Sequence, residues 1–558
     1  MKNKLTFPII LKILLCLGLA VGAYFGATGL MDSMFAYRSP LKDNPPAPGQ
    51  PFKTALTRRV VFVLVDALRN DTSHKAEVMP FLAELRQRGA WATMHSRPPS
   101  YSEPGYTALL TGASPDLSDG PPINLDYELI PTFTQDNLFS AAWRAGLKTA
   151  ISGYYWFEKL VPQEAVSASF YTSGEDQTAD RQVVEAAMPW LDDPSYQLIL
   201  IHLDQVDYAG HHEGGPQDPR WDAAAKRSDD LLREIATKLD LSQDTLLVLS
   251  DHGQIDQGGH GGQDAITLIE PFVLVGAGVK PGEYGDIQMV DVAPTLAAIL
   301  GANIPASAQG HVRTEMLTFS PEQVQTIQTA LLAQQAELLR AFQAATGKTL
   351  PPVSATEDPV DAHQAALAQA YSFSGLLGER LPRALLSFLI LIVIGGILYR
   401  RRGRELTWML GSALLYVLVF NLRYAIIDKR TYSLSSVISA DELIIYTAVT
   451  AAIALLISWL VFGLGSRMFS LNPAQSANRT LEWSLVTLAV LALPVLWSYT
   501  LNGLFVTWRL PDFASMFLGF LSMLQILLVG ASSVLLKIIT DLVSWLRRRY
   551  IRQQRTST

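Results

Sequence analysis

Cysteine is almost absent from this 558-residue sequence. The single cysteine, Cys16, lies inside an apolar N-terminal stretch, so the remaining chain has no thiol pair that could form a disulfide. This is common in bacterial and archaeal envelope proteins and unusual in eukaryotic luminal ones. The net charge is only −7, and no basic tract occurs between residues 31 and 381. We therefore expect no nucleic-acid partner.

Long apolar runs are present instead, and the mean hydropathy is positive. The first run extends from about Pro8 to Leu30 and follows Lys2 and Lys4. It is long enough to span a bilayer. A cleaved signal peptide is the competing interpretation, because small residues lie near position 20. The run exceeds the usual apolar core of a signal peptide, which favours an uncleaved anchor.

Five further apolar runs follow Pro382, at 383–399, 406–427, 443–465, 484–508 and 513–536. Each is of membrane-spanning length. Arginines are concentrated in the first and third connections and after the last run, at Arg400, Arg401, Arg402, Arg404, Arg467, Arg479, Arg547, Arg548, Arg549, Arg552 and Arg555. Such segments are typically cytoplasmic. The pattern predicts a multi-pass protein of the cell membrane with both termini in the cytoplasm and residues 31–381 outside.

These boundaries divide the chain into five parts. We expect a transmembrane anchor at 1–30, a Pro-rich linker at 31–57 that forms an extended spacer, and an extracytoplasmic catalytic domain at 58–317. A helical connector at 318–381 and an all-α membrane domain at 382–558, with five spans and a basic tail, follow. Within 58–317, β-rich runs alternate with amphipathic stretches. This alternation predicts an α/β fold with a mostly parallel sheet and helices on both faces.

Three aspartates follow apolar, β-branched runs in the expected catalytic domain. Asp66 follows VVFVLV, Asp207 lies just beyond LILIHL, and Asp251 follows TLLVLS. Open α/β sheets place their chemistry at the C-terminal ends of strands. Further candidates are one hydroxyl and three imidazoles, at Ser102, His211, His252 and His260. Each residue alone could be a loop cap or a solvated side chain, but together they suit a two-zinc phosphoryl-transfer site.

Longer segments around these residues resemble the alkaline phosphatase superfamily. They are VVFVLVDALRNDTS, the Ser102 segment ending in LLTG, VDYAGH, SDHGQIDQGGHGG and VDVAPTLAAILGANIPASAQG. Within the superfamily they are most similar to the type I phosphodiesterase/nucleotide pyrophosphatase group and to the catalytic domain of glycosylphosphatidylinositol ethanolamine phosphate transferases. The resemblance covers roughly residues 58 to 312. It implies an alkaline-phosphatase-like fold, in which helices sandwich a mostly parallel sheet.

The resemblance also implies two zinc ions and their ligands. One zinc would be held by Asp207, His211 and His260. The other would be held by Asp66, Asp251 and His252, with Ser102 bridging toward it. The neighbouring His202, Asp204 and His212 match no ligand position.

Ser102 occupies the place of the nucleophile, which is usually threonine in the family, by its spacing to the TG of LLTG. Ser100, Thr107 and Thr111 are the alternatives. Many phosphodiesterases have an asparagine three residues after the nucleophile to hold a phosphoryl oxygen. This chain has Gly105 there, so that contact must come from a backbone N–H or from elsewhere.

The implied reaction moves a phosphoethanolamine-like group from a phospholipid to a glycolipid or glycan through a phosphoseryl intermediate. Hydrolysis of phosphodiesters by an ectophosphodiesterase or nucleotide pyrophosphatase stays open, because no motif residue distinguishes water from an alcohol acceptor. The aromatic segment Tyr154 to Phe157 also keeps two interpretations, a headgroup pocket and ordinary core. The sequence specifies no protein partner.

Overall fold

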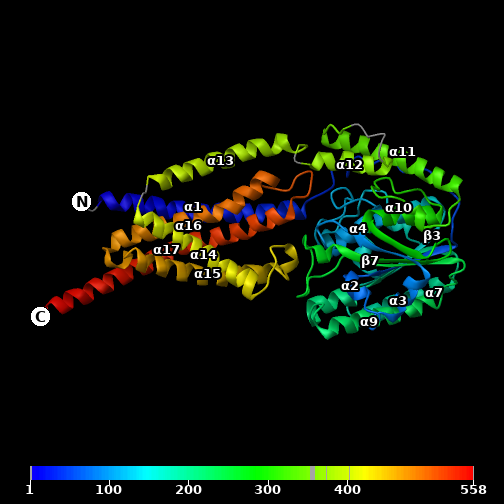
Figure 1. Ribbon diagram of the computed structural model, residues 1–558, viewed down its shortest axis with the longest axis horizontal. Coiled ribbons are helices and arrows are strands. Elements are labelled where there is room, and N and C mark those ends of the chain that lie inside the picture. The colour runs from blue at the N-terminus through cyan, green and yellow to red at the C-terminus, as the bar shows by residue number, and fades with distance from the viewer. Residues whose placement is uncertain (1–2, 352–357, 373, 401–402, 557–558) are drawn as a thin grey trace.

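The computed structural model describes residues 3–351, 358–372, 374–400 and 403–556. An α/β domain and a bundle of long helices lie end to end (Figure 1). Lys2, Arg401 and Arg402, which entered the topology prediction, lie outside the described residues.

The α/β domain is built on one eight-stranded sheet with the strand order β4-β3-β5-β1-β6-β7-β2-β8. Strand β7 is antiparallel to both of its neighbours, and the other pairs are parallel. The strands are β1 (Arg59–Val65), β2 (Ala90–His95), β3 (Lys148–Tyr154), β4 (Ala168–Thr172), β5 (Tyr196–Leu203), β6 (Asp244–Leu249), β7 (Ile269–Gly276) and β8 (Gly282–Gln288). The predicted mostly parallel sheet is confirmed.

Helices cover both faces of this sheet (Figure 1), and every residue of the central strand β1 is buried. Successive side chains of a strand point to opposite faces. Val60 and Phe62 accordingly belong to one hydrophobic cluster, which also contains residues of α4 (Ser102–Thr111), α5 (Leu138–Arg144) and α10 (Val292–Leu300). Val61 and Val63 belong to a second cluster, which also contains residues of α3 (Pro80–Arg88), α7 (Gln177–Asp192) and α9 (Pro219–Ala236).

Shorter helices and a helical connector complete this part of the chain. They are α2 (Asn70–Ser73), α6 (Trp156–Leu160), α8 (Gln205–Tyr208), α11 (Pro321–Thr346) and α12 (Pro359–Tyr371). Helix α11 begins where Ser320 and Gln323 form a capping box, and it ends at Gly347 in the left-handed conformation. Helices α11 and α12 both lie within the connector expected at 318–381.

Within the described residues, six helices are long and apolar enough to cross a membrane. They are α1 (Asn3–Phe35), α13 (Leu377–Tyr399), α14 (Arg404–Asn421), α15 (Ala440–Gly465), α16 (Pro473–Asn502) and α17 (Phe513–Thr556). Helix α16 begins earlier than the predicted run because Asn472 caps it, and it ends before Gly503. The six apolar helices indicate a multi-pass membrane protein.

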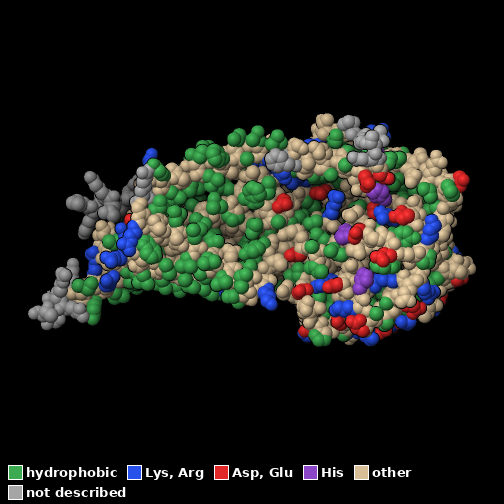
Figure 2. Space-filling view, viewed as in Figure 1, with side chains coloured by type: hydrophobic (Ala, Val, Ile, Leu, Met, Phe, Trp, Pro, Cys, Tyr) green, Lys and Arg blue, Asp and Glu red, His purple; other side chains and the backbone are tan. Residues whose placement is uncertain are grey.

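The surface of the helical bundle has the character of a membrane domain. Large apolar side chains such as Leu385, Phe388 and Ile445 are exposed on it. Figure 2 shows hydrophobic side chains along the bundle and a group of Lys and Arg side chains at the end far from the α/β domain. An apolar surface of this extent is stable only in contact with lipid or a partner.

The segment after α1 corresponds to most of the Pro-rich linker expected at 31–57. It forms neither helix nor strand, but it lies against the α/β domain. The Tyr37 hydroxyl donates a hydrogen bond to the Asp116 carbonyl at 2.9 Å, and the Arg38 guanidinium pairs with the buried carboxylate of Asp119. Further along, the Lys53 N–H donates to the Gly301 carbonyl at 2.8 Å. These contacts tie α1 to the α/β domain.

Candidate metal centre

Three neighbouring parallel strands bring the three aspartates to one edge of the sheet. Strand β1 lies between β5 and β6, and Asp66, Asp207 and Asp251 lie at or just beyond the ends of β1, β5 and β6 respectively. The chain turns sharply after β1, where Ala67 adopts a positive φ of 57°. The Ala67 N–H donates to Asp251 Oδ1 at 3.2 Å, which ties the β1 and β6 ends together.

Asp66, Asp251 and His252 form one buried group whose ligand atoms all lie within 4.8 Å of one another. His252 Nε2 is 3.4 Å from both Asp66 Oδ1 and Asp251 Oδ2. Neither of these two oxygens has a hydrogen-bond partner among the described residues. Burial raises the pKa of Asp251 well above its usual value, and the charge of Asp66 raises it further. A bound cation would offset this repulsion, so the donor set fits a metal ion.

Asp207, His211 and His260 form a second group beside the first. The Nε2 atoms of the two histidines are 2.9 Å apart, and Asp207 lies 3.5 Å from His211 and 3.4 Å from His260. His211 is one helical turn after Asp207, on a π-helical turn that follows α8. The His252 and His260 rings stack with centroids 4.0 Å apart, so the two groups form one continuous centre.

The electrostatics of this second group also favour a metal. Burial would raise the pKa of Asp207, but the neighbouring His211, His260 and His252 outweigh it and bring that pKa to about 2. Burial, together with His252, lowers the pKa of His260 well below its ordinary value. A charged carboxylate and a neutral imidazole are the forms that bind zinc.

Ser102 lies at the first position of α4, is 4% exposed, and places its Oγ 3.1 Å from His252 Nε2. The alternatives are engaged elsewhere. The Ser100 hydroxyl donates to the Gly262 carbonyl, Thr107 donates to the Pro104 carbonyl, and Thr111 donates to the Thr107 carbonyl. Of these four hydroxyls, the one of Ser102 therefore contacts a candidate metal ligand. The N-terminus of a helix also favours a bound phosphoryl anion.

Close packing explains the glycine three residues after Ser102. A Cβ on Gly105 would lie 2.8 Å from the Asp251 Cβ and 3.0 Å from the Asp251 carbonyl oxygen. An asparagine cannot occupy this position unless Asp251, a candidate ligand, moves. The expected phosphoryl contact therefore has to come from another residue.

Asn124 is a candidate for that contact, and the sequence analysis missed it. Its side-chain oxygen accepts the Glu103 N–H at 3.1 Å, which places the amide group at the N-terminus of α4. The amide N–H₂ has no acceptor among the described residues and can donate to a ligand beside Ser102. Asn124 lies in a loop without a recognisable motif, so only the folded chain reveals it.

The glutamate that follows Ser102 was also missed. Glu103 is fully buried, and burial raises the pKa of its carboxyl to about 9. One oxygen accepts the Leu125 N–H at 3.1 Å, and the other has no partner among the described residues. Burial therefore favours the protonated form of the Glu103 carboxyl.

His202 and Tyr106 hold Asp66 in place. His202 Nε2 lies 2.9 Å from Asp66 Oδ2, and the Tyr106 hydroxyl donates to the same oxygen. These bonds leave Asp66 Oδ1 free toward His252. Groups of this kind orient metal ligands in many metalloproteins.

The aromatic segment from Tyr154 to Phe157 packs against neighbouring aromatic and acidic side chains. Phe157 is fully buried and stacks on Tyr106 with centroids 4.5 Å apart. The Tyr154 hydroxyl donates to Glu175 at 2.7 Å, and the Tyr155 ring stacks on Tyr127. Phe157 thus supports the Asp66 contacts from behind.

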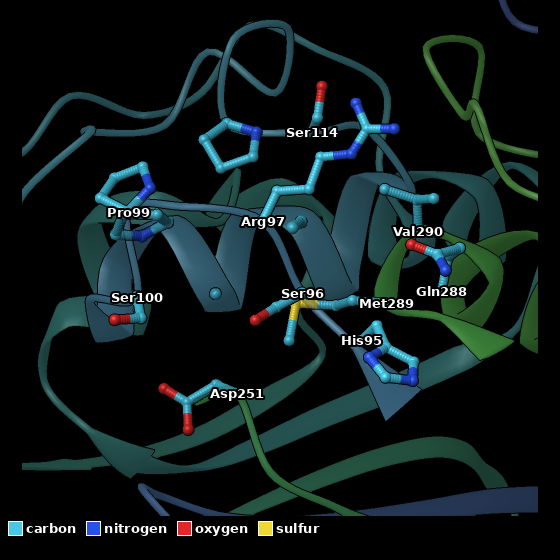
Figure 3. Close-up of a pocket in the computed structure, with 14 residues that line it drawn as sticks. His95, Ser96, Arg97, Pro99, Ser100, Ser114, Asp251, Gln288, Met289 and Val290 are labelled. Carbon is cyan, nitrogen blue, oxygen red and sulfur yellow. The ribbon is translucent and has the colours of Figure 1, made fainter. Parts of the chain in front are cut away.

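Figure 3 shows a small pocket beside α4, with Asp251 at one side of it and Arg97 at another. Its volume of about 20 Å³ has room for about one water. Arg97, Ser114, Gln288 and Val290 also line a much larger cavity of about 780 Å³. The larger cavity extends to Tyr371 on α12 and to residues 509–512, just before α17. The two cavities therefore adjoin between the metal centre and the bundle.

Comparison with known proteins finds matches to part of this chain. The family model for type I phosphodiesterase/nucleotide pyrophosphatase matches residues 60–117 and 128–337. The human GPI ethanolamine phosphate transferase 2 catalytic subunit is 29% identical over 275 residues, which cover 46% of this chain and 27% of that protein. The GPI ethanolamine phosphate transferase 2 of Yarrowia lipolytica is 28% identical over 294 residues, which cover 48% of this chain and 34% of that protein. This chain thus matches about a quarter to a third of the length of these relatives.

The matches among solved structures have low sequence identity and low TM-scores. Human ectonucleotide pyrophosphatase/phosphodiesterase 5 is 15% identical, with a TM-score of 0.39, and the match covers 44% of this chain and 95% of that structure. Wild-type alkaline phosphatase PafA is 12% identical, with a TM-score of 0.36, and the match covers 49% of this chain and the whole of that structure.

Proposed function

From the confirmed resemblance of this chain to type I phosphodiesterases and GPI ethanolamine phosphate transferases, we propose that the protein is a membrane-bound, two-zinc phosphotransferase. It moves a phosphoethanolamine-like group from a phospholipid to a glycolipid or glycan. The observation that carries the proposal is a cluster of carboxylate, imidazole and hydroxyl groups at one sheet edge, in a chain whose described residues include six apolar helices. The transferase names of the matched relatives support the choice of group.

The residues divide into two ligand sets. Asp66, Asp251 and His252 would hold one zinc ion, with Ser102 beside it, and Asp207, His211 and His260 would hold the other. Bound zinc would lower the pKa of the Ser102 hydroxyl and neutralise charge on the phosphoryl oxygens. The unpaired, buried oxygens of Asp66 and Asp251 support this assignment.

Ser102 acts as the nucleophile in the proposed reaction. Its oxygen loses its proton and bonds to phosphorus while the bond from phosphorus to the lipid oxygen breaks; the lipid oxygen takes up a proton and leaves as an alcohol, and a phosphoseryl diester results. The Asn124 amide and the N-terminus of α4 bind a phosphoryl oxygen. An acceptor hydroxyl then loses its proton, attacks phosphorus and takes the group, and the released Ser102 oxygen regains a proton.

The position of the bundle supports a lipid substrate. The cavity of about 780 Å³ is lined by residues of the α/β domain, of α12 and of the loop before α17. Charged side chains of both signs line it, at Arg97, Arg313, Arg380, Arg509, Asp116, Asp286, Asp291, Asp361 and Asp512. A phosphoethanolamine headgroup carries both a phosphate and an ammonium group and would complement both signs of charge.

The orientation in the membrane is part of the same proposal. The arginines after α13 and those in the C-terminal part of α17 would lie in the cytoplasm with both termini, and the catalytic domain of 58–317 would lie outside the cell membrane. The connector of 318–381 would then lie between this domain and the five-span membrane domain of 382–558.

A labelling experiment tests the reaction. The purified full-length protein is incubated with phosphatidylethanolamine labelled in its headgroup, with and without a membrane lipid extract. A transferase makes a new labelled lipid that depends on the extract. A labelled water-soluble headgroup as the main product would instead show a phosphodiesterase, and no product above that of Ser102→Ala would overturn the assignment.

A further inference from the structure

The loop between helices α14 and α15 lies directly on the loop that carries His260. The first loop, residues 428–439, comes from the helical bundle, and the second, residues 258–263, comes from the α/β domain. Their contact is buried, because Ser433 and Ser435 are 0% and 1% exposed. A segment far along the sequence thus reaches the candidate metal centre.

Hydrogen bonds define this contact. The Gly262 N–H donates to Ser435 Oγ at 3.0 Å, and the Gln263 N–H donates to Ser433 Oγ at 3.3 Å. The Gln263 side-chain amide donates to the Tyr432 carbonyl at 3.0 Å. Two backbone N–H groups of the glycine-rich loop therefore have acceptors supplied by the bundle.

Steric fit adds to these bonds. A Cβ on Gly262 would lie 1.6 Å from Ser433 Oγ, and a Cβ on Gly259 would lie 2.5 Å from the Ser435 carbonyl oxygen. Glycine at both positions permits the close approach of the two loops. The QGGHGG motif is thus explained in part by this contact.

The opposite side of the glycine-rich loop is held by the segment before α4. The Gly261 N–H donates to Ser100 Oγ at 3.0 Å, and His260 Nδ1 lies 3.0 Å from the Ser100 carbonyl oxygen. This bond directs Nε2 of His260 toward Asp207. His260 is therefore fixed between the Ser100 segment and the 428–439 loop.

The 428–439 loop is itself anchored to both of its helices. Arg430 forms a two-point ion pair with Glu442 on α15. The Tyr432 hydroxyl donates to Asn421 at the end of α14, and the Tyr424 hydroxyl donates to the Thr431 carbonyl at 3.0 Å. The positions of α14 and α15 therefore determine where this loop lies against the candidate metal centre.

We propose that Ser433 and Ser435 are positioning residues, which hold the His260 loop so that the imidazole can serve as a zinc ligand. The inference rests on the proposed two-zinc centre. It gives the membrane helices a part in catalysis, because α14 and α15 would set the geometry of the zinc site that His260 completes.

The test compares Ser435→Ala with Ser439→Ala in the full-length protein. Ser439 is exposed in the same loop and caps α15 without contact to the α/β domain. Zinc affinity is measured by competition with a chelating dye, and turnover is measured with a soluble chromogenic phosphodiester. We expect Ser435→Ala to lower the affinity for one of the two zinc ions by about 10- to 100-fold, as the loss of a group that orients a metal ligand does. Its kcat should fall while its KM changes little, and Ser439→Ala should behave as wild type.

A second variant decides the matter if Ser435→Ala does not fold. Gly262→Ala should weaken the binding of the same zinc ion, because its Cβ would lie 1.6 Å from Ser433 Oγ and 2.9 Å from the Ser435 backbone nitrogen and would force the two loops apart. Unchanged zinc affinity and kcat in Ser435→Ala, or in Gly262→Ala where the first variant does not fold, would refute the positioning role. Wild-type protein that binds no zinc would instead refute the two-zinc centre.

Discussion

Replacement of Ser102 by alanine tests the nucleophile directly. The substitution removes one oxygen and one hydrogen bond, to His252 at 3.1 Å. A hydrogen bond of this kind contributes about 1 kcal/mol to stability. The fold and both ligand sets should therefore persist.

The effect on activity should be far larger than the effect on stability. Without the hydroxyl, no phosphoseryl bond can form, and we expect turnover to fall at least a thousandfold, which corresponds to a barrier increase of about 4 kcal/mol. Thr107→Ala is the matched control, because it also removes a buried hydroxyl from α4, one that bonds to Pro104 and Ser118. The control should lose less than about tenfold.

The assay follows hydrolysis of a chromogenic phosphodiester, with melting temperature and zinc content measured on the same samples. Mass spectrometry of quenched wild-type enzyme should locate the phosphoryl ester on the Ser102 peptide. A Ser102→Ala enzyme that keeps its fold and a turnover within tenfold of wild type would refute the reasoning. Catalysis would then proceed by direct attack of water.

Four further outcomes are expected. Asn124→Ala should lower kcat by about 10- to 1000-fold, as loss of an oxyanion donor does, and a normal kcat would exclude the assigned contact. Arg97→Gln should raise KM for a phospholipid and leave KM for a soluble diester unchanged, and an equal change in both would disprove a headgroup role. Burial raises the pKa of Glu103 to about 9. The contribution of the protonated Glu103 carboxyl to the free energy of unfolding is therefore complete below the ordinary carboxyl pKa and is lost as the pH rises through about 9. The melting temperature of Glu103→Gln should therefore fall less than that of wild type between pH 6 and 9, and parallel curves would contradict the shift. A reporter fused after Thr558 should be cytoplasmic and one inserted near Asn44 external, and both on one side would refute the topology.

Local patterns in the sequence determined the elements of this protein. Long apolar runs predicted six long helices, because a span must satisfy every backbone polar group within itself. Apolar β-branched runs predicted β1, β5 and β6, and the aspartate after each run marked the strand end. The motifs around these aspartates were specific enough to indicate the family.

Only the tertiary structure decided how distant segments complete the centre. Asn124, His202 and Tyr106 reach it through side-chain contacts that leave no local pattern in the sequence. Ser435 lies 173 residues after the glycine whose N–H it accepts, in a loop between two apolar helices. Periodicity reports which face of an element is buried, whereas the packing of one domain against another depends on shape and on hydrogen-bond partners far apart in the chain.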